Sequence, residues 1–82
     1  MPAIYVLNVP EFKSLVDVAE AQPGWRVTAV AGDYYRIESA SDLVFHRKEL
    51  KMKPAVWYGC LTGGVRGKVV QFDRDNVRIS AE

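Results

Sequence analysis

The sequence contains one cysteine, one histidine and no long hydrophobic run, and each shortage excludes a class of protein. Cys60 alone cannot form an intramolecular disulfide, and one chain with His46 as its only histidine cannot assemble a zinc site of nitrogen and sulfur ligands. No apolar stretch approaches the roughly 20 residues that a membrane-spanning helix needs. We therefore predict no metal site, no cofactor and no membrane partner.

The chain also lacks an excess of charge of either sign. Eleven lysines and arginines stand against ten aspartates and glutamates, which gives a net charge of +1. This balance provides no strong attraction to nucleic acids or to anionic membranes. The first residues, 1–4, lack the basic lead of a secretion signal, and a free cysteine suits a reducing compartment. We expect a cytoplasmic protein.

Hydrophobic residues, in contrast, are abundant for so short a chain. The 82 residues fit a single domain, 1–82, and 49% of them are hydrophobic. A domain of this size buries only about 60–65% of the surface that its unfolded chain exposes, so its core is thin. Small domains compensate with disulfides, metals or a partner subunit, and only the last is open here. We expect a homo-oligomer, most simply a dimer; the alternative is a compact monomer with a few exposed apolar residues.

The first half of the chain predicts a strand, a helix and a β-meander. Residues 3–7 form a continuous apolar run, which is typical of a strand covered on both faces. A helix over 9–21 follows, with Asn8 and Glu11 in a capping-box arrangement and Pro10 in its first turn. Its apolar stripe consists of Phe12, Leu15, Val16 and Ala19. The meander has predicted strands at 25–31, 34–38 and 43–46.

The segment 54–62 has two interpretations. Its β-branched and aromatic residues indicate a buried strand. Against that, Pro54 fits the first position of a helix, and the glycines at 63–64 fit the end of one. We favour a short buried helix.

The C-terminal residues predict a β-hairpin. Residues 68–72 and 76–80 flank three turn-forming residues, 73–75, so that Val70 and Phe72 can face the second strand. The fold class is therefore α+β, a small single domain of order β-α-β-β-β-α-β-β. We expect a mainly antiparallel sheet with the first helix packed on one face. Residues 67–79 resemble the hairpin of KOW-type, SH3-like ribosomal and transcription modules, but the helical N-terminal part does not fit such a barrel, and no residue role is carried over.

A glycine-rich stretch at 63–68 is similar in composition to a phosphate-binding loop. The spacing is wrong for that loop, Val69 stands where a hydroxyl is needed, and a strand follows instead of a helix. The glycines are better interpreted as a tight connection. An anion held by backbone N–H groups together with Arg66 and Lys68 stays open as an unspecific possibility.

No catalytic residue is predicted. His46 and Cys60 could in principle form a base and a nucleophile, but no orienting acid or oxyanion site is recognisable. Cys60 lies among apolar neighbours and is expected to behave as a small hydrophobe with a raised pKa. His46 fits a surface or structural role better than a catalytic one.

Aromatic and basic residues supply the remaining candidates. The aromatic residues could stack on bases or line a pocket, but bulk for a thin core or a subunit interface is the favoured interpretation. Trp57 and Tyr58 are adjacent and point differently, so we expect one of them to reach an interface. The basic segment 47–53, with Arg36 on a neighbouring strand, could form a weak nucleic-acid surface. The candidate ligand or interface residues are Tyr35, His46, Trp57, Tyr58 and Arg66.

These observations favour a small non-catalytic interaction, regulatory or accessory protein that acts as a homo-oligomer. A weak nucleic-acid-binding module that uses residues 47–53 is the first alternative. A small enzyme or ligand binder with its site at a subunit boundary is the second.

Overall fold

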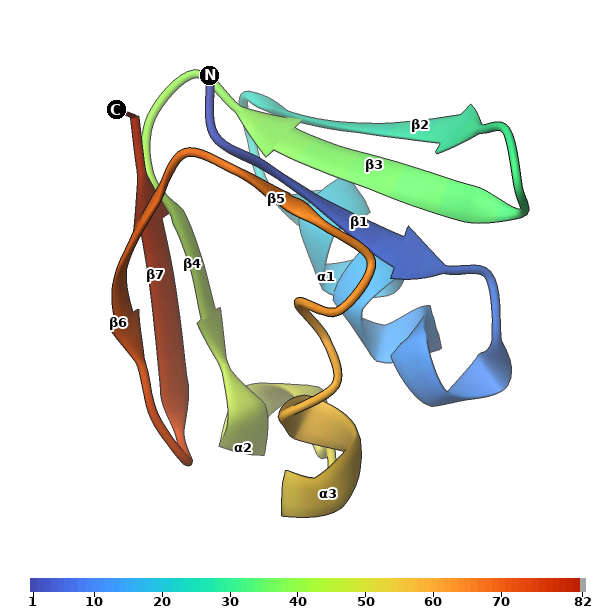
Figure 1. Ribbon diagram of the computed structural model, residues 1–82, viewed down its shortest axis with the longest axis vertical. Coiled ribbons are helices and arrows are strands. Elements are labelled where there is room, and N and C mark those ends of the chain that lie inside the picture. The colour runs from blue at the N-terminus through green and yellow to red at the C-terminus, as the bar shows by residue number, and fades with distance from the viewer. Residues whose placement is uncertain (82) are drawn as a thin grey trace.

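Seven strands in the computed structural model, which describes residues 1–81, form two antiparallel sheets (Figure 1). Sheet A has the strand order β2-β3-β1-β5 and comprises β1 (Ala3–Leu7), β2 (Trp25–Val30), β3 (Tyr34–Ser39) and β5 (Val65–Arg66). Sheet B has the order β4-β7-β6 and comprises β4 (Leu43–His46), β6 (Lys68–Phe72) and β7 (Asn76–Ser80). The helices are the 3-10 turn η1 (Pro10–Phe12), α1 (Lys13–Ala21), α2 (Arg47–Leu50) and α3 (Pro54–Trp57). The predicted α+β class is confirmed, and α2 and β5 are additions to the expected order.

The core fills the angle between the two sheets, and α1 packs on the face of sheet A that looks into this angle (Figure 1). Trp25 of β2 packs edge-on against Phe45 of β4, with ring centroids 5.3 Å apart, so the sheets share one core. The largest fully buried side chains are Trp57, Phe45, Ile4, Leu15, Ile37, Leu43 and Ile79.

The predicted meander is wrong at its third strand. β4 pairs with β7 of sheet B and not with β3. The reason is that both edges of β3 are already occupied, one by β2 and the other by β1. The chain therefore leaves sheet A after Ser39 and enters sheet B at Leu43. A second crossing, from β5 to β6, passes through Gly67, whose φ is 116° and where a Cβ would lie 2.5 Å from the carbonyl oxygen of Ser80.

Strand β1 has the predicted extent, but the prediction that both of its faces are covered is wrong. Ala3, Ile4 and Val6 are buried, whereas Tyr5 is half-buried and Leu7 is 40% exposed. Ile4 and Val6 face the core, whereas Tyr5 and Leu7 point to the opposite side of the sheet.

Helix α1 is confirmed together with its apolar stripe, because Leu15, Val16 and Ala19 are buried. The predicted capping box is wrong. Asn8 is tied to the turn between β2 and β3: its backbone N–H donates to the carbonyl of Asp33 (2.8 Å) and its Nδ2 donates to Oδ1 of the same residue (3.3 Å). The chain then forms η1 at Pro10, and α1 begins only at Lys13.

In the ambiguous segment 54–62 the helical interpretation is confirmed, but only for one turn. α3 begins with Pro54 at its first position and ends at Trp57, and turns continue the chain to Gly63. Trp57 and Cys60 are buried, while Tyr58 between them is 51% exposed.

The C-terminal hairpin is confirmed, with one correction to its register. Val69 lies opposite Ile79, and Phe72 lies opposite Val77. A bulge between Val69 and Gln71 leaves Val70 without a partner in β7, so Val70 does not face the second strand as predicted. The extra residue of a bulge shifts the alternation of side chains, and a local sequence pattern does not reveal it.

Candidate functional site

An exposed apolar surface surrounds β6, one of the two edge strands of sheet B. Within residues 1–81, β6 pairs only with β7, so its other edge has no strand partner. Val69 and Val70 are 43% and 47% exposed on this strand. Tyr58 extends the surface, because its ring lies 5.7 Å from that of Phe72. We call these four residues the β6 surface.

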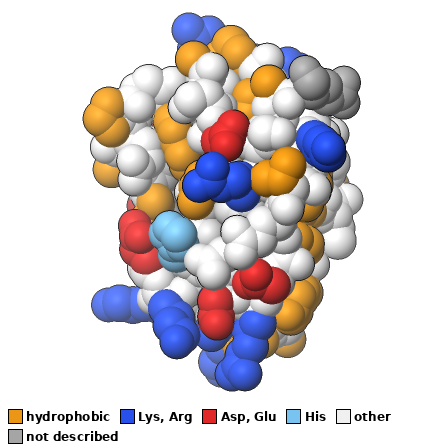
Figure 2. Space-filling model, turned by 90° about the vertical axis from the view of Figure 1, so that its left-hand side faces the viewer, with side chains coloured by type: hydrophobic (Ala, Val, Ile, Leu, Met, Phe, Trp, Pro, Cys, Tyr) orange, Lys and Arg blue, Asp and Glu red, His pale blue; other side chains and the backbone are white. Residues whose placement is uncertain are grey.

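The surroundings of the β6 surface are mixed. Figure 2 shows the molecule from the side of sheet B, where hydrophobic side chains alternate with charged ones and Lys and Arg side chains gather at the lower end, below the single histidine. An exposed edge strand with adjacent valines is a template for pairing with another chain. The arrangement is therefore suited to binding a polypeptide.

Trp57 packs against the β6 surface from the interior of the protein. Its side chain is fully buried, its Nε1 donates to the carbonyl of Asp73 (2.7 Å), and its ring packs against Phe72 at 6.0 Å. Of the two adjacent aromatic candidates, Trp57 therefore holds the hairpin turn while Tyr58 faces solvent. The local sequence shows two adjacent aromatic residues, but it indicates neither the hydrogen bond of Trp57 nor the exposure of Tyr58.

His46 and Cys60 do not form a nucleophile and its base. His46 is exposed at the end of β4, and its Nδ1 donates to Oδ1 of Asn76 (2.6 Å) on β7. Cys60 is 1% exposed, and burial raises the pKa of its thiol to about 11. A thiol with such a pKa stays protonated at neutral pH, which makes it a poor nucleophile.

The basic segment 47–53 is less available than its composition indicates. Arg47 is bound to the turn of the hairpin: Nη2 forms an ion pair with Asp75 (2.8 Å), Nε donates to the carbonyl of Arg74 (2.7 Å), and Nη1 donates to that of Met52 (3.0 Å). The lysines of the segment are exposed. Arg36, which was expected to lie next to this segment, belongs to the other sheet.

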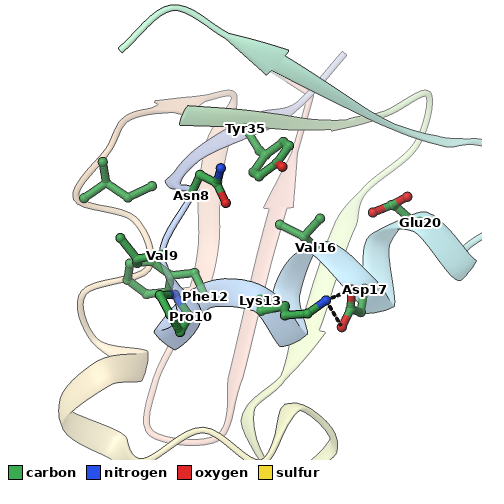
Figure 3. A pocket seen from close by; sticks show the side chains of 10 residues that line it. Asn8, Val9, Pro10, Phe12, Lys13, Val16, Asp17, Glu20 and Tyr35 are labelled. Atoms are coloured by element: carbon green, nitrogen blue, oxygen red, sulfur yellow. Dashed lines mark hydrogen bonds and ion pairs between the residues drawn. The ribbon is translucent and has the colours of Figure 1, made fainter. Parts of the chain in front are cut away.

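Tyr35 lines a groove of about 320 Å³ between α1 and the end of β1 (Figure 3). Its ring points toward Val16 of the helix, and Phe12 lies at the other end of the groove. Charged groups form the rim, where Lys13 pairs with Asp17 at 3.3 Å. The volume is at the lower limit for small-molecule sites. The groove can hold a small apolar molecule and contains no pair of groups arranged for catalysis.

Arg66 lies on sheet A, where its Nη2 donates to the hydroxyl of Tyr5 (3.1 Å). The five candidate residues are therefore spread over four places: Tyr35 in the groove, His46 at the end of β4, Trp57 and Tyr58 beside β6, and Arg66 on β5. Among residues 1–81, no group of three or more His, Cys, Asp or Glu side chains is placed to hold a metal ion. No helix within the same residues is long and apolar enough to cross a membrane.

No protein-family model matches the chain, and no curated protein matches it either. A function has to be inferred from its own residues and their geometry.

Proposed function

We propose that this chain is a small non-catalytic interaction protein that acts as a homodimer, in which two copies pair antiparallel along their β6 strands. The observation that carries the proposal is the open edge of β6 with its two exposed valines, Val69 and Val70. Pairing would satisfy the free backbone groups of this edge and reduce the exposure of both valines to water.

The charges at the two ends of β6 support a second copy as the occupant. Lys68 begins the strand and Asp73 follows its last residue. An antiparallel pair brings the start of one strand beside the end of the other, so each Lys68 would approach the partner's Asp73. Hydrogen bonds from Gln71 and from the backbone N–H groups of Asp75 and Asn76 lower the pKa of Asp73, which keeps its carboxylate ionised at neutral pH.

The symmetry of this arrangement limits it to two copies. A two-fold pairing uses the same edge of both subunits and leaves no open β6 edge for a third. Such a dimer also supplies the apolar burial that a thin core lacks. The protein would act in the cytoplasm, where a reducing environment keeps the thiol of Cys60 free.

Size-exclusion chromatography with light scattering tests the proposal. We expect the wild-type protein to have twice the monomer mass at micromolar concentration. Val70→Lys places a charge in the centre of the pairing edge and is expected to give a monomer. Leu7→Lys is the matched control, since Leu7 is 40% exposed on the other sheet, and this variant is expected to remain a dimer.

Two results would contradict the proposal. A wild-type monomer at high concentration removes the dimer itself. A dimer that survives Val70→Lys but is lost in Leu7→Lys places the interface on sheet A. Circular dichroism of both variants ensures that a change of mass does not come from unfolding.

A further inference from the structure

Sheet A has a second face, which points away from α1 and the core (Figure 1). Successive side chains of a strand point to opposite sides, so residues paired across strands share a face. Tyr5 of β1 pairs with Arg36 of β3, and Leu7 pairs with Tyr34. The outer face carries the aromatic and charged side chains of Tyr5, Tyr34, Arg26, Arg36, Arg66 and Glu38.

The outer face carries positive charge although the whole chain is nearly neutral. Its one carboxylate, Glu38, is buried and lies 3.4 Å from Nε of Arg36. Arg26 and Arg66 are exposed, and neither forms an ion pair with another residue between 1 and 81. The charges of these two arginines are therefore not compensated. Both arginines lie at the same end of the sheet, because the strand register places Arg26 opposite Glu38, Glu38 opposite Ala3, and Ala3 opposite Arg66.

Two tyrosine rings lie on the same face: Tyr5 contacts Arg66, and Tyr34 lies farther along the sheet, opposite Leu7. Tyr5 and Tyr34 are diagonal neighbours on adjacent strands, and both are half-buried. Diagonal partners in an antiparallel sheet are about 7–8 Å apart, which allows two aromatic side chains to serve neighbouring units of one extended ligand. Both residues also line a small cavity of about 20 Å³, which Phe12 and Cys60 line from the side of the core.

Two glycines lie against these tyrosines. A Cβ at Gly63 would overlap the carbonyl oxygen of Tyr5 and lie 2.9 Å from Cε1 of Tyr34, and a Cβ at Gly64 would lie 3.4 Å from Cδ2 of Tyr5. Gly63 and Gly64 thus pass the two rings without side chains of their own. Arg66 follows two residues after Gly64, and its Nη2 donates to the hydroxyl of Tyr5.

We propose that the outer face of sheet A binds single-stranded nucleic acid. Tyr5 and Tyr34 would stack on successive bases, while Arg26 and Arg66 contact phosphates. Aromatic side chains combined with a positively charged surface are what a single strand requires, since every base has a face to stack and every nucleotide a negative charge. A duplex offers no free base face to the tyrosines, and an acidic polypeptide would use only the arginines.

Fluorescence anisotropy of a labelled oligo-deoxythymidine 12-mer tests this proposal at several salt concentrations. We expect binding at low salt that weakens as salt rises, with a logarithmic slope of about −0.7 for each phosphate contact. The double variant Arg26→Gln/Arg66→Gln should reduce this slope by about 1.4. Tyr5→Ala should weaken binding about 5- to 150-fold, whereas Tyr5→Phe keeps the ring and should retain most of the affinity.

The lysines of the segment 47–53 provide the matched control. Lys48→Gln/Lys51→Gln removes the same charge from exposed residues elsewhere, and we expect its affinity and salt slope to equal those of the wild type. Thermal melting of each variant shows whether it is folded.

Three results would overturn the proposal. The first is absence of binding at low salt. The second is an equal loss in the lysine control, which would place binding on the segment 47–53 or in unspecific charge. The third is competition by poly-glutamate or by a duplex as strong as that by the single strand, which would mean that the tyrosines contribute nothing.

Discussion

At the scale of single residues, Cys60 couples the stability of the protein to alkaline pH. Its side chain is 1% exposed, and burial raises the pKa of the thiol from 9.0 to about 11, although a backbone hydrogen bond partly opposes the shift. Between these two values the unfolded chain releases the proton that the folded chain retains. The unfolded state then binds fewer protons than the folded state, so the free energy of unfolding falls as pH rises.

This effect can be measured by urea unfolding at about pH 8 and about pH 10.5. Cys60→Ala has no thiol, so its stability should fall less between the two pH values than that of the wild type. All other titratable groups are the same in both proteins, so the difference between the two losses reports on the thiol. An identical loss in wild type and variant would mean that the thiol is not desolvated in the folded protein.

Arg47 shows how one side chain changes the interpretation of a charged segment. The segment 47–53 is basic in composition, and from the sequence alone Arg47 counts as part of a surface. In the fold its guanidinium group is bound to the turn of the hairpin near Asp75. This partner is 28 residues away along the chain, so no local pattern identifies it.

At the scale of elements, the turn of the C-terminal hairpin depends on Asp73. Its Oδ1 accepts the backbone N–H groups of Asp75 (3.0 Å) and Asn76 (2.9 Å), and its Oδ2 accepts Nε2 of Gln71 (2.9 Å). These bonds lower the pKa of the carboxyl group below 3.8, with that from Gln71 the largest cause. The carboxylate therefore stabilises the fold above this pH, and its contribution is lost as pH falls through the lowered pKa.

We expect Asp73→Asn to keep the two backbone bonds, because the amide retains an oxygen at the same position, but to remove this acid dependence. Asp73→Ala loses the bonds as well and should be less stable than Asp73→Asn at every pH. Thermal unfolding of both variants and the wild type between about pH 2 and pH 7 measures the difference. Equal stability of the two variants would show that the backbone bonds do not hold the turn.

The elements that could be predicted from the sequence are those defined by neighbouring residues. The stripe of α1 and the hairpin at 68–80 depend on spacing and turn residues alone, and both are confirmed. The capping box failed because Asn8 is bound to Asp33, which lies 25 residues away. The sequence predicts the strand β4 but not its pairing with β7. The two edges of β3 are filled by β1 and β2, so β4 cannot pair with β3.

At the scale of the whole molecule, the candidate surfaces depend on contacts that the sequence does not contain. Arg66 and Tyr5 meet across 61 residues, and only the register of sheet A places them on one face with Arg26. Tyr58 could be recognised as a candidate from its sequence position, but its contact with Phe72 requires the hairpin to fold back over α3. The sequence therefore predicts which residues are candidates for binding, but it does not predict which of them lie together on one surface.

The shared core predicts that both sheets unfold in a single step. Trp25 of sheet A packs on Phe45 of sheet B, and Trp57 packs beneath β6 on Phe72.

Each tryptophan reports on a different side of the molecule, so Trp25→Phe leaves a probe near sheet B and Trp57→Phe leaves one in sheet A. In each variant we expect the urea transition seen by tryptophan fluorescence to coincide with that seen by far-ultraviolet circular dichroism. Trp57→Phe loses a buried ring and a hydrogen bond and should unfold at lower urea, but its two probes should still agree. If the Trp25 signal in that variant changed before the circular dichroism, sheet A would open separately, and residues 1–82 would not behave as one cooperative domain.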